Sequence, residues 1–342
     1  MRPHTGTPGP FEPRHLSRRD LFLAPLPAEP LPSGYLIRVY RQAMACRFEV
    51  TLPGEDARHV AAARAALDLV DAIEAHLTVF RDTSPLVRLN QHARRDWTPV
   101  DAGLFALLDT CRELHASTGG AFDVTTTPLS RCWGFLRREG RLPAALEVEA
   151  ALASVGMDGV QLDAEAGRVR FSKPAMELNL GAIGKGYALD RVAEDLRRRD
   201  VRHALVSAGR SSLLALGGRG DDWTVDIRSP RARGRLARVT VRDGALGTSG
   251  AGEQFVEVDG VRYGHVLDPR TGWPASGVLS ATVVTGSAAA ADALSTAFLV
   301  GGAELAQRYC AAHPAVLALV TPDDGSERPI VFGRYPGAVV ED

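Results

Sequence analysis

Apolar residues recur at three- and four-residue steps along several stretches of the chain, and this spacing predicts amphipathic helices. In the longest stretch, residues 56–80, one helical face carries Val60, Ala63, Leu67, Val70 and Leu77. Further helices are predicted over residues 102–117, after Pro143, and over 184–199, 288–302 and 303–312. Ser287 is a suitable N-cap for the helix that ends at the glycine pair 301–302.

Short segments rich in β-branched and aromatic residues predict strands between these helices. They cover residues 36–40, 47–51, 169–180 around Pro174, 203–207, 213–216, 223–227, 237–241, 254–258, 279–284 and 315–320. Helices and strands mix without strict β-α-β alternation. The pattern therefore predicts an α+β or layered α/β fold rather than a Rossmann sheet, with residues 35–342 as one functional unit.

Residues 1–34 form a Pro/Arg-rich segment that is predicted to be a disordered tail. Within it, the run Ser17 to Leu23 contains Arg18-Arg19 and resembles the start of a twin-arginine export signal. Pro25 and Pro27 interrupt the apolar run that should follow. A degenerate signal and a plain tail both remain open, and so does the compartment, cytoplasm or cell envelope.

Composition is ordinary for a globular protein, with 45% hydrophobic and 24% charged residues and a net charge of −1 over 342 residues. This near-neutral balance argues against nucleic acid or an anionic membrane as the partner. No run of 18 apolar residues predicts a transmembrane span. The four cysteines form no CxxC pair, which disfavours a zinc or redox motif and leaves a disulfide open.

Two segments concentrate candidate chemistry. Asp292 and Thr296 lie four residues apart in a helical run, on one helix face, where their oxygens suit a hard cation. The segment Gly264-His265-Val266-Leu267-Asp268-Pro269-Arg270-Thr271-Gly272 places a histidine, an acid and an arginine in one short loop. A lone histidine is more often structural, but its neighbours here favour a pre-organised polar loop.

Several turns have both a functional and a structural interpretation. Lys185, one of only two lysines, follows a strand in the glycine-rich turn 181–186, which is suited to anions at a helix N-terminus or is simply a tight turn. Residues 206–212 are either a second phosphate or sugar loop or a solvated turn. Residues 119–123 are predicted as a helix C-cap and loop, and 133–135 as core aromatics rather than a cofactor face. Residues 247–250 are predicted as a small polar turn, with contact to ligand hydroxyls as the alternative.

Taken in order, these segments resemble the ApbE family of FAD:protein FMN transferases from Met44 to about Gly302. The resemblance rests on Met44, Ser84–Asn90, Gly120–Asp123, Pro128-Leu129, Trp133–Phe135, the turn Gly181–Asp190, Gly247–Gly250, His265–Gly272 and Asp292–Thr296. It implies an ApbE-like fold of mixed or antiparallel sheets packed by helices. It also implies transfer of the FMN half of FAD onto a threonine or serine of a target protein, with release of AMP.

The resemblance also implies roles for particular residues. A Mg²⁺ or Mn²⁺ ion would be held by the backbone carbonyl of Ala182 with Asp292 and Thr296. His265 would activate the incoming hydroxyl, with Lys185 and Asp292 also in the catalytic set. FAD contacts are implied at Met44, Phe80, Ala121, Phe122, Asp123, Asn179, Lys185, His265 and Val266. The expected partners are FAD and a target protein, expected to be a redox or electron-transfer protein.

The chain departs from the family pattern at four places. Asn179 stands where the family usually has aspartate, Pro85 where it has glutamate, and Arg210 where it has glycine; Met44-Ala45-Cys46 replaces Met-Gly-Thr. Two other functions therefore stay open beside the transferase. Water in place of the acceptor hydroxyl would make the protein an FAD pyrophosphatase, and loss of turnover would make it a flavin-binding or flavin-donor protein.

Overall fold

An eight-stranded antiparallel sheet forms the centre of the fold in this computed structural model, which describes residues 34–137, 139–218, 222–231, 234–252, 254–326 and 328–341. Its strands follow the order β1-β2-β6-β7-β10-β13-β14-β15. They are β1 (Leu36–Ala43), β2 (Cys46–Pro53), β6 (Ala204–Ala208), β7 (Ser212–Leu216), β10 (Gly244–Gly250), β13 (Val278–Thr285), β14 (Leu317–Pro322) and β15 (Ile330–Gly333). Three smaller sheets and the helices complete an α+β fold, which confirms the predicted class.

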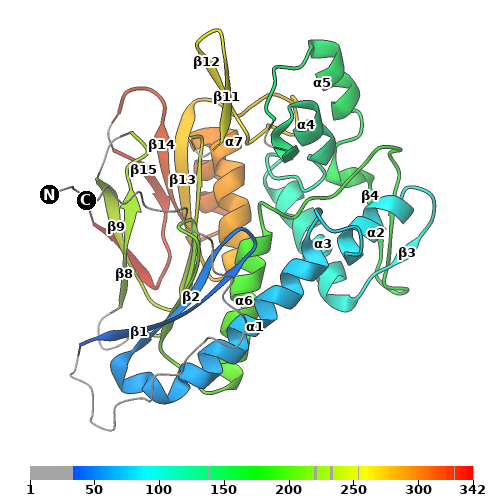
Figure 1. Cartoon of the computed structure of the whole chain (residues 1–342). Coiled ribbons are helices and arrows are strands. Elements are labelled where there is room, and N and C mark those ends of the chain that lie inside the picture. The colour runs from blue at the N-terminus through cyan, green and yellow to red at the C-terminus, as the bar shows by residue number, and fades with distance from the viewer. Residues whose placement is uncertain are drawn as a thin grey trace, which may run out of the picture.

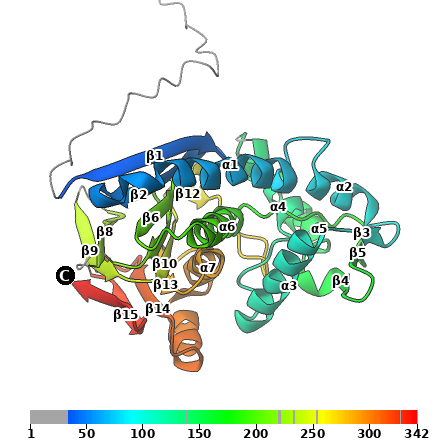
Figure 2. The same cartoon turned by 90° about the horizontal axis from the view of Figure 1, so that it is seen from below.

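Both faces of the large sheet are covered. Helices α1 (Val60–Leu77), α6 (Gly184–Arg198) and α7 (Ala288–Ala312) lie along one face, as Figure 2 shows. Strands β8 (Trp223–Arg228), β9 (Arg235–Val241) and β16 (Ala338–Glu341) form a three-stranded sheet against the other. Apolar residues on alternate strand positions, such as Val206 and Leu214, therefore bury against the helices and build a layered core.

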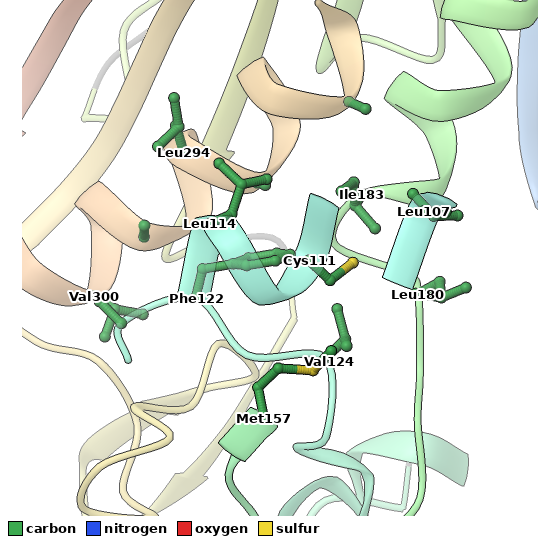
Figure 3. Close-up of a cluster of buried hydrophobic side chains, with 14 of the residues drawn as sticks. Leu107, Cys111, Leu114, Phe122, Val124, Met157, Leu180, Ile183, Leu294 and Val300 are labelled. Atoms are coloured by element: carbon green, nitrogen blue, oxygen red, sulfur yellow. The ribbon is translucent and has the colours of Figure 1, made fainter. Parts of the chain in front are cut away.

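A second, mostly helical region lies beside the sheet (Figure 1). It contains α2 (Pro85–His92), α3 (Ala102–Ser117), α4 (Thr127–Cys132), α5 (Ala145–Leu152) and a small sheet of β3 (Thr98–Pro99), β5 (Arg168–Phe171) and β4 (Val160–Asp163). The core of this region is continuous with α7, because Leu114 of α3 and Leu294 of α7 belong to one buried hydrophobic cluster. Figure 3 shows this cluster, which also contains Leu107, Cys111 and Phe122. The cleft between this region and the sheet is where the candidate site forms.

Most predicted elements are confirmed within a few residues, including α3, α6 and the helix capped by Ser287, whose hydroxyl accepts from Ala290 N. The predicted break at the glycine pair is also present, because Gly302 adopts a φ of 71° inside α7. α7 is long and apolar enough to cross a membrane by composition alone, but 61% of its most apolar window is buried within the fold. An apolar helix that is mostly buried in this way is typical of a protein core.

Three sequence predictions are wrong in detail. Residues 247–250 are the end of strand β10 and not a turn; small polar residues occur there because this end of the strand faces a cavity. The predicted strands over 169–180 shrink to β5, and the long first helix begins as a 3-10 turn (Gly54–His59) and ends at Leu77. The twin-arginine-like segment lies outside the described residues.

Candidate functional site

Two adjoining cavities lie between the sheet and the helical region, with volumes of about 340 and 280 Å³. Asn179, Gly181 and Lys185 line both, so the cavities meet at the turn before α6. Every site residue predicted from the sequence lines one of them. The larger holds Ala121, Phe122, Asp123, Asn179, Ala182, Lys185, His265, Val266, Asp292 and Thr296, and the smaller adds Met44 and Phe80.

Asp292 lies in the first half of α7 and is only 5% exposed. Its Oδ1 accepts a hydrogen bond from Ser212 Oγ at 2.7 Å, and its Oδ2 accepts one from the backbone N–H of Gly186 at 2.8 Å. Two glycines make this packing possible. A Cβ on Gly186 would lie 2.0 Å from the Ala288 carbonyl oxygen, and a Cβ on Gly247 would also meet α7 backbone.

Thr296 lies one helical turn beyond Asp292 and lines the same cavity. Its hydroxyl donates to the Asp292 carbonyl at 3.2 Å, which leaves the oxygen lone pairs of Thr296 for other partners. Ser249 Oγ of β10 lies 3.1 Å from Thr296 Oγ1 and 2.9 Å from Ser295 Oγ. The end of β10 therefore holds the hydroxyl of Thr296 in place.

This oxygen set suits a hard divalent cation. Burial raises the pKa of Asp292 to about 6, against the opposing effects of Lys185, Ser212 and the Gly186 N–H. Each carboxylate oxygen accepts one hydrogen bond and retains a lone pair, and a nearby cation would favour the ionised form. Among the described residues no three His, Cys, Asp or Glu side chains cluster, so a single carboxylate with hydroxyl and carbonyl oxygens favours Mg²⁺ or Mn²⁺ over softer ions.

Lys185 is the second residue of α6, and its side chain borders both cavities. No ion pair joins it to a carboxylate within the described part of the chain. The N-terminal end of a helix carries a partial positive charge from its free N–H groups. Lys185 and the start of α6 together make the junction of the two cavities electropositive, as an anionic group such as a pyrophosphate requires.

His265 follows strand β12 (Val261–Gly264), which pairs with β11 (Phe255–Val258) as a hairpin. Its Nδ1 lies 3.1 Å from the carbonyl oxygen of Gln254, and its backbone N–H donates to the same oxygen at 3.0 Å. Because a carbonyl only accepts, this contact assigns the proton to Nδ1. Nε2 is then the nitrogen that can accept a proton from a hydroxyl.

The charged residues of the loop from His265 to Gly272 are structural. Asp268 accepts from the backbone N–H, Nε and Nη2 of Arg270 at 2.8–2.9 Å, so the acid and the arginine neutralise each other. Trp133 Nε1 donates to the Gly272 carbonyl at 3.0 Å, and a Cβ on Gly272 would lie 2.6 Å from Val148. The ion pair of Asp268 and Arg270 therefore fixes the conformation of the loop that carries His265. Trp133 is fully buried, which confirms its predicted role in the core.

Ala121, Phe122 and Asp123 follow α3 and line the larger cavity. The Asp123 side chain is 1% exposed and accepts hydrogen bonds from Thr125 and from Met157 N. His115 Nδ1 lies 3.1 Å from Asp123 Oδ2, and this hydrogen bond raises the pKa of His115. The Asp123 carboxylate thus holds the loop together, and because it is buried, little of the Asp123 side chain is exposed to the cavity.

The smaller cavity is largely apolar. Met44 and Ala45 form the tight turn between β1 and β2 and both have positive φ, 48° and 57°. Such a turn normally uses Asn or Gly, so Ala45 is strained here. Phe80 follows α1, lines the same cavity and is 75% exposed. Its uncovered ring and Met44 are available to a flat apolar ligand.

Of the departures from the family pattern, Asn179 and Ala45 line the cavities, and Pro85 and Arg210 do not. Pro85 is the first residue of α2, where proline is favourable, and it lines neither cavity. Asn179 Oδ1 accepts from Gly181 N at 2.8 Å, a bond that an aspartate would also make. Arg210 is exposed beside Ser211, which lines the larger cavity.

Sequence reasoning missed several hydroxyl groups of the site. Ser130, Ser211, Thr248 and Ser249 line the larger cavity, and Ser212 contacts Asp292 from β7. Four of these residues had a signal: Ser211 and Ser212 lie within the possible ligand loop of residues 206–212, and Thr248 and Ser249 lie in the polar turn predicted over 247–250. Asp190 was also missed: it accepts from the N–H groups of Ala288 and Ala289 and so anchors the start of α7 to α6.

Comparison with known proteins identifies relatives across most of the chain. The sequence model of the ApbE family matches residues 44–320. A protein named FAD:protein FMN transferase from Treponema pallidum is 33% identical over 297 residues, covering 81% of this chain and 82% of its own. One of the same name from Klebsiella pneumoniae is 31% identical over 296 residues, with 83% of each chain covered.

Solved structures agree with the sequence comparison. The crystal structure of the ApbE protein from Thermotoga maritima superposes with a TM-score of 0.79 at 29% identity, over 88% of this chain and 97% of that one. The apo form of the flavinyl transferase ApbE from Pseudomonas stutzeri gives 0.75 at 28% identity, over 88% and 96%.

Proposed function

Since this chain belongs to the ApbE family, we propose that it is an FAD:protein FMN transferase, which moves FMN from FAD to a threonine or serine of a target protein and releases AMP. One observation carries the proposal. Lys185, His265 with an accepting Nε2, and the oxygen pair of Asp292 and Thr296 converge on a single cavity from three distant segments.

FAD would occupy both cavities, with its pyrophosphate at their junction. The junction is bordered by Lys185, Asn179 and Gly181, so the electropositive end of α6 faces the phosphates. Ala182, Asp292 and Thr296 would hold Mg²⁺ or Mn²⁺ in the larger cavity. When bound, this cation would neutralise phosphate charge and stabilise the charge that develops on the leaving oxygen.

His265 would act as the general base. The acceptor hydroxyl loses its proton to Nε2 as its oxygen forms a bond to the phosphorus of the FMN half. The bond from that phosphorus to the bridging oxygen breaks, and AMP leaves with the electron pair. Lys185 stabilises the phosphate oxygens, and the Nδ1–H bond to Gln254 orients the imidazole.

The test is a labelling assay. Purified protein is incubated with FAD, Mg²⁺ and candidate electron-transfer proteins, with AMP and covalent flavin fluorescence of the acceptor as readouts. We expect AMP and labelled acceptor in equal amounts. AMP without labelled acceptor identifies an FAD pyrophosphatase, and bound FAD with neither product identifies a flavin carrier; either result overturns the proposal.

A further inference from the structure

The hairpin of β11 and β12 stands at the mouth of the larger cavity. Gly250, before the hairpin, and His265, directly after it, both line this cavity. Figure 1 shows the hairpin projecting from the body of the molecule. Any polypeptide that binds along the hairpin would therefore reach the group assigned as the general base.

The two faces of the hairpin differ. Val256 and Tyr263 face the fold, where the Tyr263 ring lies 5.6 Å from that of Trp133. Phe255, Glu257 and Arg262 lie on the other face. The Arg262 guanidinium lies over the Phe255 ring at 4.7 Å and pairs with Glu257 at 3.0 Å, while Phe255 remains 43% exposed. The inner face thus anchors the hairpin, and the outer face stays open.

The backbone edges of the hairpin are unpaired. The backbone N–H of His265 donates to the Gln254 carbonyl, so these two residues form a hydrogen-bonded pair. From this pair to the turn at Asp259-Gly260, non-hydrogen-bonded and hydrogen-bonded pairs alternate along the hairpin. That alternation turns the backbone N–H and C=O of four residues outward: Phe255, Glu257, Arg262 and Gly264. None of these groups has a hydrogen-bond partner among the described residues. Both edges can therefore accept a further strand.

We propose that this hairpin docks the acceptor protein, which adds an extended segment to one of its edges as a third strand. The inference rests on the proposed transferase function, because transfer requires a protein hydroxyl at His265. Only an extended polypeptide matches a row of alternating donors and acceptors. A strand rises about 3.3 Å per residue, so a hydroxyl one or two residues beyond the segment paired at Phe255 or Gly264 lies beside the cavity.

Proline variants test the docking edge without breaking the hairpin. Glu257→Pro removes one outward N–H from β11, and Arg262→Pro removes one from β12; neither N–H takes part in the β11–β12 ladder. Proline is tolerated at strand edges in this orientation. Glu257→Ala and Arg262→Ala are the matched controls, since each deletes the same side chain and the same ion pair.

The probe is an electron-transfer protein that the wild-type chain labels with flavin. We expect one of the two proline variants to raise the KM for this acceptor about tenfold over its alanine control, with kcat and FAD binding unchanged. If both proline variants match their controls, the docking edge is refuted and flavin transfer stands. If the wild-type chain labels no acceptor, the transferase function fails and the docking inference fails with it.

Discussion

Replacing Ser212 by alanine tests how the site holds its cation. Ser212 is fully buried in β7, and its hydroxyl donates to Asp292 Oδ1 at 2.7 Å. Asp292 accepts only one other hydrogen bond in the described structure, from Gly186 N, so Ser212→Ala removes half of the bonds that orient this carboxylate. Ser212 contacts neither cavity and would act only through Asp292.

The size of the effect follows from the burial of both partners. A hydrogen bond to a charged group contributes about 1.5–3 kcal/mol, and loss of a partner behind a metal ligand typically weakens metal binding about 10- to 100-fold. We therefore expect Ser212→Ala to weaken Mn²⁺ binding by at least about tenfold, as measured by electron paramagnetic resonance of free Mn²⁺ in a titration without FAD.

A matched control separates this effect from general destabilisation. Ser280 is also buried in the large sheet, but its hydroxyl donates to Thr321 and it lines neither cavity. Ser280→Ala should lose some thermal stability and keep wild-type Mn²⁺ affinity. A folded Ser212→Ala variant that binds Mn²⁺ as tightly as the Ser280→Ala variant would refute the role assigned to Ser212.

Three further predictions address the remaining groups. Asp292→Ala should abolish metal-dependent AMP release while circular dichroism shows an intact fold; full activity in that variant would exclude Asp292 as a ligand. His265→Gln should lower flavin transfer about 100-fold or more and leave FAD affinity within a few-fold, since general-base catalysis typically contributes about 10²–10⁴-fold; a loss of FAD binding alone would contradict the base role. His115 has a pKa raised by its hydrogen bond to Asp123, so its contribution to stability is complete below its unfolded pKa of about 6.5 and is lost as pH rises through the folded pKa. The melting temperature of the wild type should thus fall relative to His115→Gln from pH 6.5 upward, and parallel curves for the two proteins would disprove this.

The fold was predictable where local pattern decides it. Apolar spacing located α3 and α6 because one face of each packs on a core, and Ser287 marked the start of α7 because a hydroxyl satisfies a free N–H there. The end of β10 was missed because Thr248 and Ser249 face a polar cavity rather than a core. Strand composition reflects what a strand packs against, and this depends on segments far along the chain.

The same argument separates what was predictable in the candidate site. Asp292 and Thr296 share a helix face, so their proximity follows from sequence spacing alone. Ser212 is 80 residues from Asp292, and the contact exists only because Gly186 and Gly247 let α6 and β10 pack directly on the backbone of α7. Asp268 and Arg270 show the converse, because two charged residues beside His265 pair with each other and act on the loop instead of the substrate. Residue type and spacing therefore indicate which groups are available, and long-range packing decides which of them face the cavity.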